Sequence, residues 1–210
     1  MVFKAVLVLT VLLLLGSTAL VGGRFLGFID DSPGAVAVCD SLTSAQRKAL
    51  VGTKTSHATE KPAGDGARRT CRWTAAEDDD STLVEVTSMS AGKWVADLAR
   101  DLSASGSDGP VDAARRDVRQ RALELGDGAD DQEACALASE VFELDGAPRG
   151  AQRTVTFERG GPKSSPRLVA EGCSAGTFTR VVAAAPGLRS SPALERRATR
   201  ALTQAQERLS

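Results

Sequence analysis

The chain has 210 residues, of which 42% are hydrophobic and 25% charged, a composition typical of a folded globular domain. Its formal net charge is only -1, so no overall field exists that would hold a polyanion such as a nucleic acid. The chain contains no Asn, which excludes N-linked glycosylation.

An uncharged apolar segment, AVLVLTVLLLLGSTALVGG, spans residues 5–23. At about 1.5 Å per residue, a helix of this length crosses a hydrocarbon layer of roughly 30 Å. The basic start at Lys4 and the small residues at 17–19 also fit an export signal that is cleaved. Apolar residues on both sides of Arg24 favour an uncleaved anchor. We therefore expect residues 1–29 to be a membrane anchor or signal and residues 30–38 a linker.

Both interpretations of the apolar segment place the rest of the chain outside the cytoplasm. With Lys4 inside and Asp30 and Asp31 outside, the anchored form crosses the cell membrane once, with its C-terminal domain extracytoplasmic; the alternative is secretion after cleavage. Lipid attachment at Cys39 does not fit, because Val38 stands where a lipidation motif needs a small residue. Cys39 is therefore expected to form a disulfide.

Four cysteines, an even number, suit an oxidising compartment and predict two disulfides. Three pairings are open, and the sequence alone does not decide between them. We favour the sequential pairing because it closes one loop within each half of the chain. The disulfide residues are then Cys39 with Cys71 and Cys135 with Cys173.

The first half of the extracytoplasmic domain is expected at residues 39–104. Thr43 and Gln46 make a capping box for a short helix that ends at Gly52. Residues 53–69 are polar and are predicted to be a surface loop that carries His57. Strands are predicted at residues 70–74, with Cys71 and Trp73 on one face, and at 82–89, with inward-facing valines, and together they form an antiparallel hairpin. A helix follows at about 92–102, with an apolar stripe that begins at Trp94.

A Ser, Gly and Asp-rich linker at 103–110 divides the chain, and the second half is expected at residues 105–210. An Arg-rich helix is predicted at 111–121, with Val118 inward, and a tight turn at 125–128. Residues 134–144 are ambiguous between helix and strand. Strands are predicted at 153–159, 168–173 and 177–184, and a final helix opens at Ser191-Pro192 with an apolar stripe.

The two halves share one order of elements: a cysteine, strands with a second cysteine at or beside one of them, and a closing helix. This order resembles an internal duplication, but any disulfide-stapled α+β domain with hairpins and helices has a similar plan. We favour the second explanation. The expected fold is α+β, an N-terminal transmembrane helix followed by an antiparallel sheet with helices on one face.

Several short motifs resemble a group of actinobacterial exported cell-envelope proteins of unknown function, many of them lipoproteins. The motifs are Cys39-Asp40-Ser41-Leu42-Thr43, Cys71-Arg72-Trp73 and the turn at residues 125–129. The resemblance covers roughly residues 39–185 and implies an α+β fold with a bridge between the first two cysteines. More distantly, the chain is similar to two-disulfide extracellular sensor domains of some actinobacterial kinases, which implies ligand binding.

Candidate chemical motifs are better explained by structural roles. Ser90-Ala91-Gly92-Lys93 spells Ser-x-x-Lys, but no other element of the penicillin-recognising enzymes accompanies it, and a helix-capping Ser90 explains it. The only histidine, His57, lacks a nucleophile motif, and no Cys-x-x-Cys pair suggests a metal. Acidic runs at 77–80 and 127–133 lack the ligand pattern of a calcium loop. Acids are interspersed among the arginines at 115, 116, 119, 121, 196, 197 and 200, so solvated helix faces are favoured over contact with anionic lipid or wall polymer.

These observations predict no catalytic residues, no cofactor and no metal. We expect a membrane-tethered extracytoplasmic module of the bacterial cell envelope that binds an envelope protein or wall polymer and does not bind nucleic acid. The alternatives are a hydrolase directed at the cell wall and an extracellular ligand-sensing domain. Only residues 1–4 would lie in the cytoplasm, which argues against signalling by this chain alone.

Overall fold

The computed structural model describes residues 37–62, 68–76, 81–104, 113–161 and 164–210, which belong to one compact unit. The expected anchor, 1–29, and nearly all of the linker, 30–38, lie outside the described residues. Among the helices within those ranges, none is long and apolar enough to cross a membrane. The described part is an α+β fold, as the sequence predicts.

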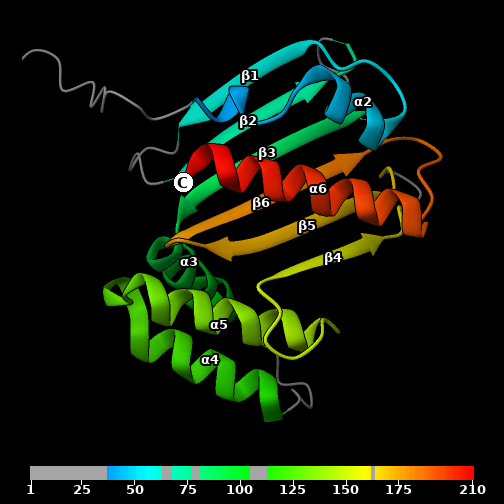
Figure 1. The fold of residues 1–210 in the computed structure, drawn as a ribbon. Coiled ribbons are helices and arrows are strands. Elements are labelled where there is room, and N and C mark those ends of the chain that lie inside the picture. The colour runs from blue at the N-terminus through cyan, green and yellow to red at the C-terminus, as the bar shows by residue number, and fades with distance from the viewer. Residues whose placement is uncertain (1–36, 63–67, 77–80, 105–112, 162–163) are drawn as a thin grey trace, which may run out of the picture. The chain divides into compact units, whose positions relative to one another are not determined.

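The described residues form a six-stranded sheet in the order β1-β2-β3-β6-β5-β4, in which every neighbouring pair is antiparallel. The first meander contains β1 (His57–Pro62), β2 (Arg68–Thr74) and β3 (Leu83–Ser90). The second contains β4 (Arg153–Glu158), β5 (Arg167–Ser174) and β6 (Thr177–Ala184). The meanders join along β3 and β6, in the middle of the sheet (Figure 1).

One face of the sheet, named here the covered face, packs under α6 (Pro192–Leu209), α2 (Ser44–Val51) and the 3-10 turn η1 (Val38–Asp40) (Figure 1). Alternate strand residues point to this face because the side-chain period of a strand is two. Trp73 is 2% exposed, and Val84 and Val86 are fully buried. Together with the buried stripe of α6 they form the first core, so the predicted inward positions of these strands are confirmed.

The opposite face, named the open face, is covered only at one end. Met89, Cys173 and Phe178 share a cross-strand row there. They pack with α3 (Ala91–Ala104), α4 (Ala113–Leu125) and α5 (Asp131–Leu144) in the second core. The expectation of helices on one face only was therefore wrong. Helices pack on this face as well because α3–α5 bury the apolar row at the end of β3, β5 and β6.

Each core contains one disulfide. Cys39 bonds to Cys71 in the first core, with a Cα–Cα distance of 5.1 Å. Cys135 on α5 bonds to Cys173 on β5 in the second core, with a Cα–Cα distance of 5.3 Å. Both bridges are those of the sequential pairing, and each joins a segment that precedes a meander to the central strand of that meander.

The helices begin where the sequence supplies caps. Thr43 and Gln46 form the predicted capping box of α2, and Gly52 ends that helix with a φ of 81°, a left-handed conformation that glycine adopts without steric cost. The Ser90 hydroxyl accepts from the backbone N–H of Lys93 at 3.3 Å in the first turn of α3. The Ser191 hydroxyl caps α6, and proline follows it, as predicted.

Two local predictions needed the structure. The loop predicted at 53–69 was wrong in part, because residues 57–62 form β1, which pairs along its whole length with β2. Its sequence, HATEKP, has no apolar alternation, so the pairing with β2 and not hydrophobic patterning makes it a strand. The ambiguous residues 134–144 belong to helix α5, whose N-cap Asp130 accepts from the backbone N–H groups of Gln132 and Glu133.

The two halves share an order of elements but not a three-dimensional arrangement. Because β3 and β6 are adjacent and antiparallel, a half-turn about an axis perpendicular to the sheet brings the second meander onto the first. This rotation leaves each face of the sheet on its own side. The bridge that precedes the first meander lies on the covered face, whereas the one that precedes the second lies on the open face. The closing helices are reversed in the same way, since α3 packs in the second core and α6 in the first. This reversal favours the explanation of a shared general plan over a duplication.

Candidate functional site

The open face carries charged and hydroxyl side chains along the strands beyond the second core. In one cross-strand row Arg72 lies opposite Glu85, and Glu85 lies opposite Val182. In the next row Thr87 lies opposite Arg180, and Arg180 lies opposite Glu171. These are the residues that alternate with the buried valines of the covered face, so the strand period that builds the first core also builds this polar surface.

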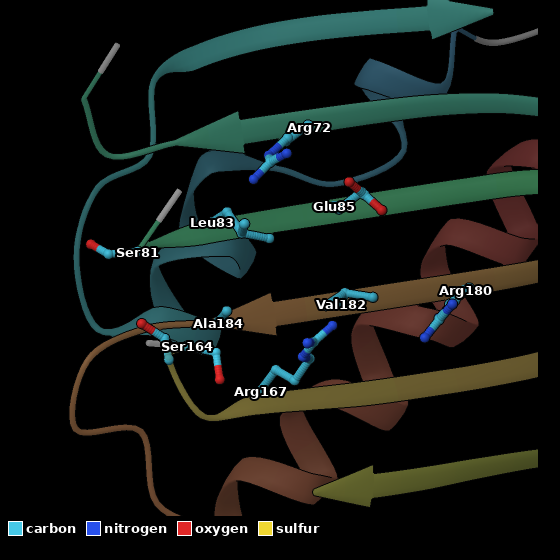
Figure 2. A pocket seen from close by; sticks show the side chains of 10 residues that line it. Arg72, Ser81, Leu83, Glu85, Ser164, Arg167, Arg180, Val182 and Ala184 are labelled. Atoms are coloured by element: carbon cyan, nitrogen blue, oxygen red, sulfur yellow. The ribbon is translucent and has the colours of Figure 1, made fainter. Parts of the chain in front are cut away.

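A cavity of about 470 Å³ hollows this surface over β3 and β6. Figure 2 shows it from the open side, with α6 behind the strands. We name it the arginine cavity. Its described lining comprises Arg72, Arg167, Arg180, Glu85, Leu83, Val182, Ala184, Ser81, Ser164 and Ser165. The volume is within the roughly 300–1,000 Å³ of typical small-molecule sites.

Two of the arginines contact carboxylates at the margin of the cavity. Arg167 Nε lies 3.0 Å from Glu158 Oε2, and both side chains are about half exposed, at 48% and 49%. Arg180 Nε lies 3.2 Å from Glu171 Oε1. Neither Glu158 nor Glu171 lines the arginine cavity, whereas Glu85 does. The described lining therefore contains three guanidinium groups and one carboxylate, and two further carboxylates at its margin pair with two of the guanidinium groups.

A second cavity of about 270 Å³ adjoins the first, and the two share Glu85 and Arg180. It lies between the open face and α3, which contributes Trp94 and Asp97 to its walls. We name it the α3 cavity. The ring of Trp94 stacks on Phe178 at a centroid distance of 4.8 Å, so this wall is held by the second core.

Asp97 is the centre of an ion network at the α3 cavity. Its carboxylate lies 2.5 Å from Arg68, 3.2 Å from Lys93 and 2.9 Å from Arg100. Burial raises the pKa of the Asp97 carboxyl, but hydrogen bonds from Lys93 and Arg100 and the charge of Arg68 outweigh burial and hold the pKa below its ordinary value. The bridge to Arg68 connects α3 with β2 and fixes the wall of the cavity.

The pKa of the Glu171 carboxyl is shifted in the opposite direction. Burial raises the pKa of its carboxyl above the ordinary value; the charge of Arg180 opposes this, and the charges of Asp145 and Glu158 add to it. The side chain is 23% exposed. A carboxyl with a raised pKa in a cavity is typical of a functional group, although ion pairs in structural networks shift pKa values as well.

The structure places each residue that was considered as a candidate catalyst. Ser90 caps α3, and Lys93 Nζ lies 3.2 Å from Asp97 Oδ1. The Ser-x-x-Lys motif therefore lies at a helix start, as predicted, with the lysine ammonium held by a carboxylate. His57 begins the edge strand β1 with an exposed side chain.

The acidic and arginine-rich segments are accounted for where the structure describes them. Asp130 of the second acidic run caps α5, while residues 77–80 lie outside the described residues. Arg116, Arg119 and Arg121 are exposed on α4, and Arg121 pairs with Glu140 of α5. Arg196, Arg197 and Arg200 are exposed on α6.

Sequence reasoning missed the cluster of Arg72, Arg167 and Arg180. The available signal was local: Arg72 and Glu85 alternate with buried residues of β2 and β3, so both belong on the polar side of their strands. The order of the strands was missing from the sequence. Because β3 pairs with β6, residues about one hundred positions apart meet over one cavity.

Comparison of the chain with protein-family models, with curated proteins and with solved structures yields no match.

Proposed function

We propose that this protein is an extracytoplasmic, membrane-tethered module of the cell envelope that binds its ligand on the open face and acts without catalysis. The apolar segment at 5–23 supports the tether. Two disulfides support an oxidising compartment, since such bridges are rare in the cytosol. The observation that carries the proposal is the contrast between the faces, of which one is buried under α2 and α6 and the other presents a charged cavity of about 470 Å³.

The test is retention of the full-length, detergent-purified protein on the insoluble cell-wall fraction of its own organism. Val182→Trp fills the floor of the arginine cavity without removing a charged group. The matched control is Leu123→Trp, at a residue that is 51% exposed on α4. We expect Val182→Trp to lose retention and Leu123→Trp to keep it. Urea unfolding of both variants verifies that each is folded.

Equal retention of the wild type and Val182→Trp would contradict binding at the open face. Absence of retention for the wild type, together with absence of capture from the membrane fraction, would contradict an envelope-binding function altogether. A component captured from the membrane fraction supports the proposal only if the Val182→Trp variant fails to capture it and the Leu123→Trp variant still does.

A wall-directed hydrolase is the second candidate, and Glu171 is the observation that favours it. Glycoside hydrolases combine a carboxyl of raised pKa, which donates a proton, with a second carboxylate. Glu171 has the raised pKa, and Glu85 lines the α3 cavity together with it. Release of soluble fragments from purified wall, abolished in Glu171→Gln but not in Glu158→Gln, would support hydrolysis over binding.

A further inference from the structure

Resting on the proposed binding function, we infer that the arginine cavity takes a saccharide that bears an oxyanion, either a carboxylate or a phosphate. Three properties of the described lining carry this inference: the geometry of the guanidinium groups, the position of the cavity within the sheet, and the combination of apolar residues with hydroxyl groups.

The guanidinium groups of the lining suit an anionic ligand. Arg72, Arg167 and Arg180 come from three different strands, and Glu85 is the one carboxylate of the described lining. Arg72 and Arg167 lie on either side of the floor in Figure 2, with Arg180 farther along β6. A guanidinium presents a planar fork of donors that matches the two oxygens of a carboxylate or phosphate. An oxyanion entering the cavity competes for these groups with the partners that they already have, which for Arg167 and Arg180 are Glu158 and Glu171.

The position of the cavity selects against an extended peptide. Peptides that add to a sheet use the unpaired N–H and C=O groups of an edge strand. In this sheet the edges are β1 and β4, whereas the cavity lies over β3 and β6 in the middle. The main-chain groups of these strands are committed to the ladders on both sides. A ligand there meets side chains, not backbone donors.

The floor and rim fit a saccharide. Leu83, Val182 and Ala184 form an apolar floor between the arginines (Figure 2). Ser81, Ser164 and Ser165 add hydroxyl groups to the lining. A sugar ring has C–H faces that bury apolar floor and hydroxyl groups around its rim that exchange hydrogen bonds with serines and with Glu85. Polar groups placed around an apolar floor are the usual composition of a specific small-molecule site.

Isothermal titration of the full-length protein in detergent with three trisaccharides tests the inference. The probes are trigalacturonic acid for the carboxylate source, phosphorylated maltotriose for the phosphate source, and neutral maltotriose. We expect one or both anionic probes to bind and the neutral probe to bind at least tenfold more weakly. Arg72→Gln and Arg167→Gln should each weaken the anionic probe about tenfold or more. Arg196→Gln, an exposed arginine on α6 of the covered side, should leave it unchanged.

Each outcome has a defined meaning. Equal binding of the neutral and anionic probes, or anionic binding that survives in the Arg72→Gln, Arg167→Gln double variant, overturns the inference. Failure of all three probes also overturns it, and the wall-retention test then separates two cases. If retention is present and lost in Val182→Trp, the open face binds another ligand class; if retention is absent, the proposed function fails as well. Preference for one anionic probe identifies the oxyanion.

Discussion

The two cores of this domain differ in how much of the sheet they cover. The first core extends along the covered face from η1 to the end of α6, with buried residues on both meanders. The second core occupies one end of the opposite face, where Met89, Phe178 and Cys173 meet α3–α5. The rest of that face carries charged residues and two adjoining cavities. Antiparallel sheets commonly pack one face on a core and leave the other in contact with solvent, and here the part of the open face beyond the second core is available for recognition.

The disulfides give the largest expected effects and test whether the cores are independent. Sequence separations of 32 and 38 residues predict that removing either bridge costs about 4 kcal/mol through loop entropy. In the Cys39→Ala, Cys71→Ala variant we expect protection from exchange to fall throughout the domain, because that bridge lies in the first core. Cys135→Ala, Cys173→Ala should chiefly open α4 and α5. Urea unfolding combined with amide hydrogen exchange measures both.

The disulfide comparison fails if protection from exchange falls equally in α5 and α6 of the Cys135→Ala, Cys173→Ala variant. Such a result would show that the two cores unfold as one cooperative unit. Comparable losses of stability with distinct exchange patterns would support separate units.

Replacing one tryptophan in each core compares how much a single side chain contributes to the stability of that core. Trp73 is 2% exposed on the covered face, and the Arg47 guanidinium lies 4.7 Å from its ring centroid. Truncation to alanine should cost about 3–5 kcal/mol, as for a buried aromatic residue. Trp94 is only partly buried, at the margin of the second core, so Trp94→Ala should cost about half as much. Urea denaturation of the two variants measures the difference; a larger loss for Trp94→Ala would reverse the ranking of the cores.

Two carboxylates that line the α3 cavity should respond to pH in opposite directions. The raised pKa of Glu171 means that the fold prefers its neutral form, so its contribution is present below the unfolded pKa and is lost as pH rises through the folded value. Glu171→Gln should therefore gain stability relative to the wild type as the pH rises from about 4 to about 7. Unfolding measured across that range would contradict this prediction if the difference were constant.

The pKa of the Asp97 carboxyl is shifted in the opposite direction, so its effect on stability has the opposite dependence on pH. Its lowered pKa means that the contribution is present above the unfolded pKa and is lost as pH falls through the folded value. Asp97→Asn should cost about 1 kcal/mol near neutral pH, because its partners Arg68 and Arg100 are exposed to solvent and screened. The cost should shrink as the pH falls below the unfolded pKa of about 3.9 and approaches the lower folded value. A cost independent of pH would indicate a role in packing rather than charge.

The helix caps give the smallest expected effects. Ser90 and Ser191 each accept one backbone N–H, at 3.3 Å and 3.2 Å, at the starts of α3 and α6. Replacement by alanine should cost about 1 kcal/mol in each case. Thermal unfolding measures both, and an ester or nitrocefin reporter tests for turnover. Loss of a measurable turnover in Ser90→Ala alone would contradict the capping role.

Local patterns in the sequence determined much of this protein. The capping box at Thr43 and Gln46, the alternation around Trp73, the hairpin of β2 with β3 and the stripe of α6 all follow from interactions within a few residues. The α+β class follows from these elements. The sequential disulfide pairing was favoured on the same plan, and the structure contains it.

Only the tertiary structure decided the strand order, the second helix layer and the candidate site. β1 has no apolar pattern and is a strand because β2 pairs with it. The segment at 134–144, ambiguous in sequence, is helical in α5, and its buried residues, such as Phe142, pack in the second core. Arg72, Arg167 and Arg180 face one cavity because β3 and β6 pair in the middle of the sheet. Local sequence encodes which side of a strand a residue occupies, whereas the neighbours of that strand depend on contacts between residues far apart in the chain.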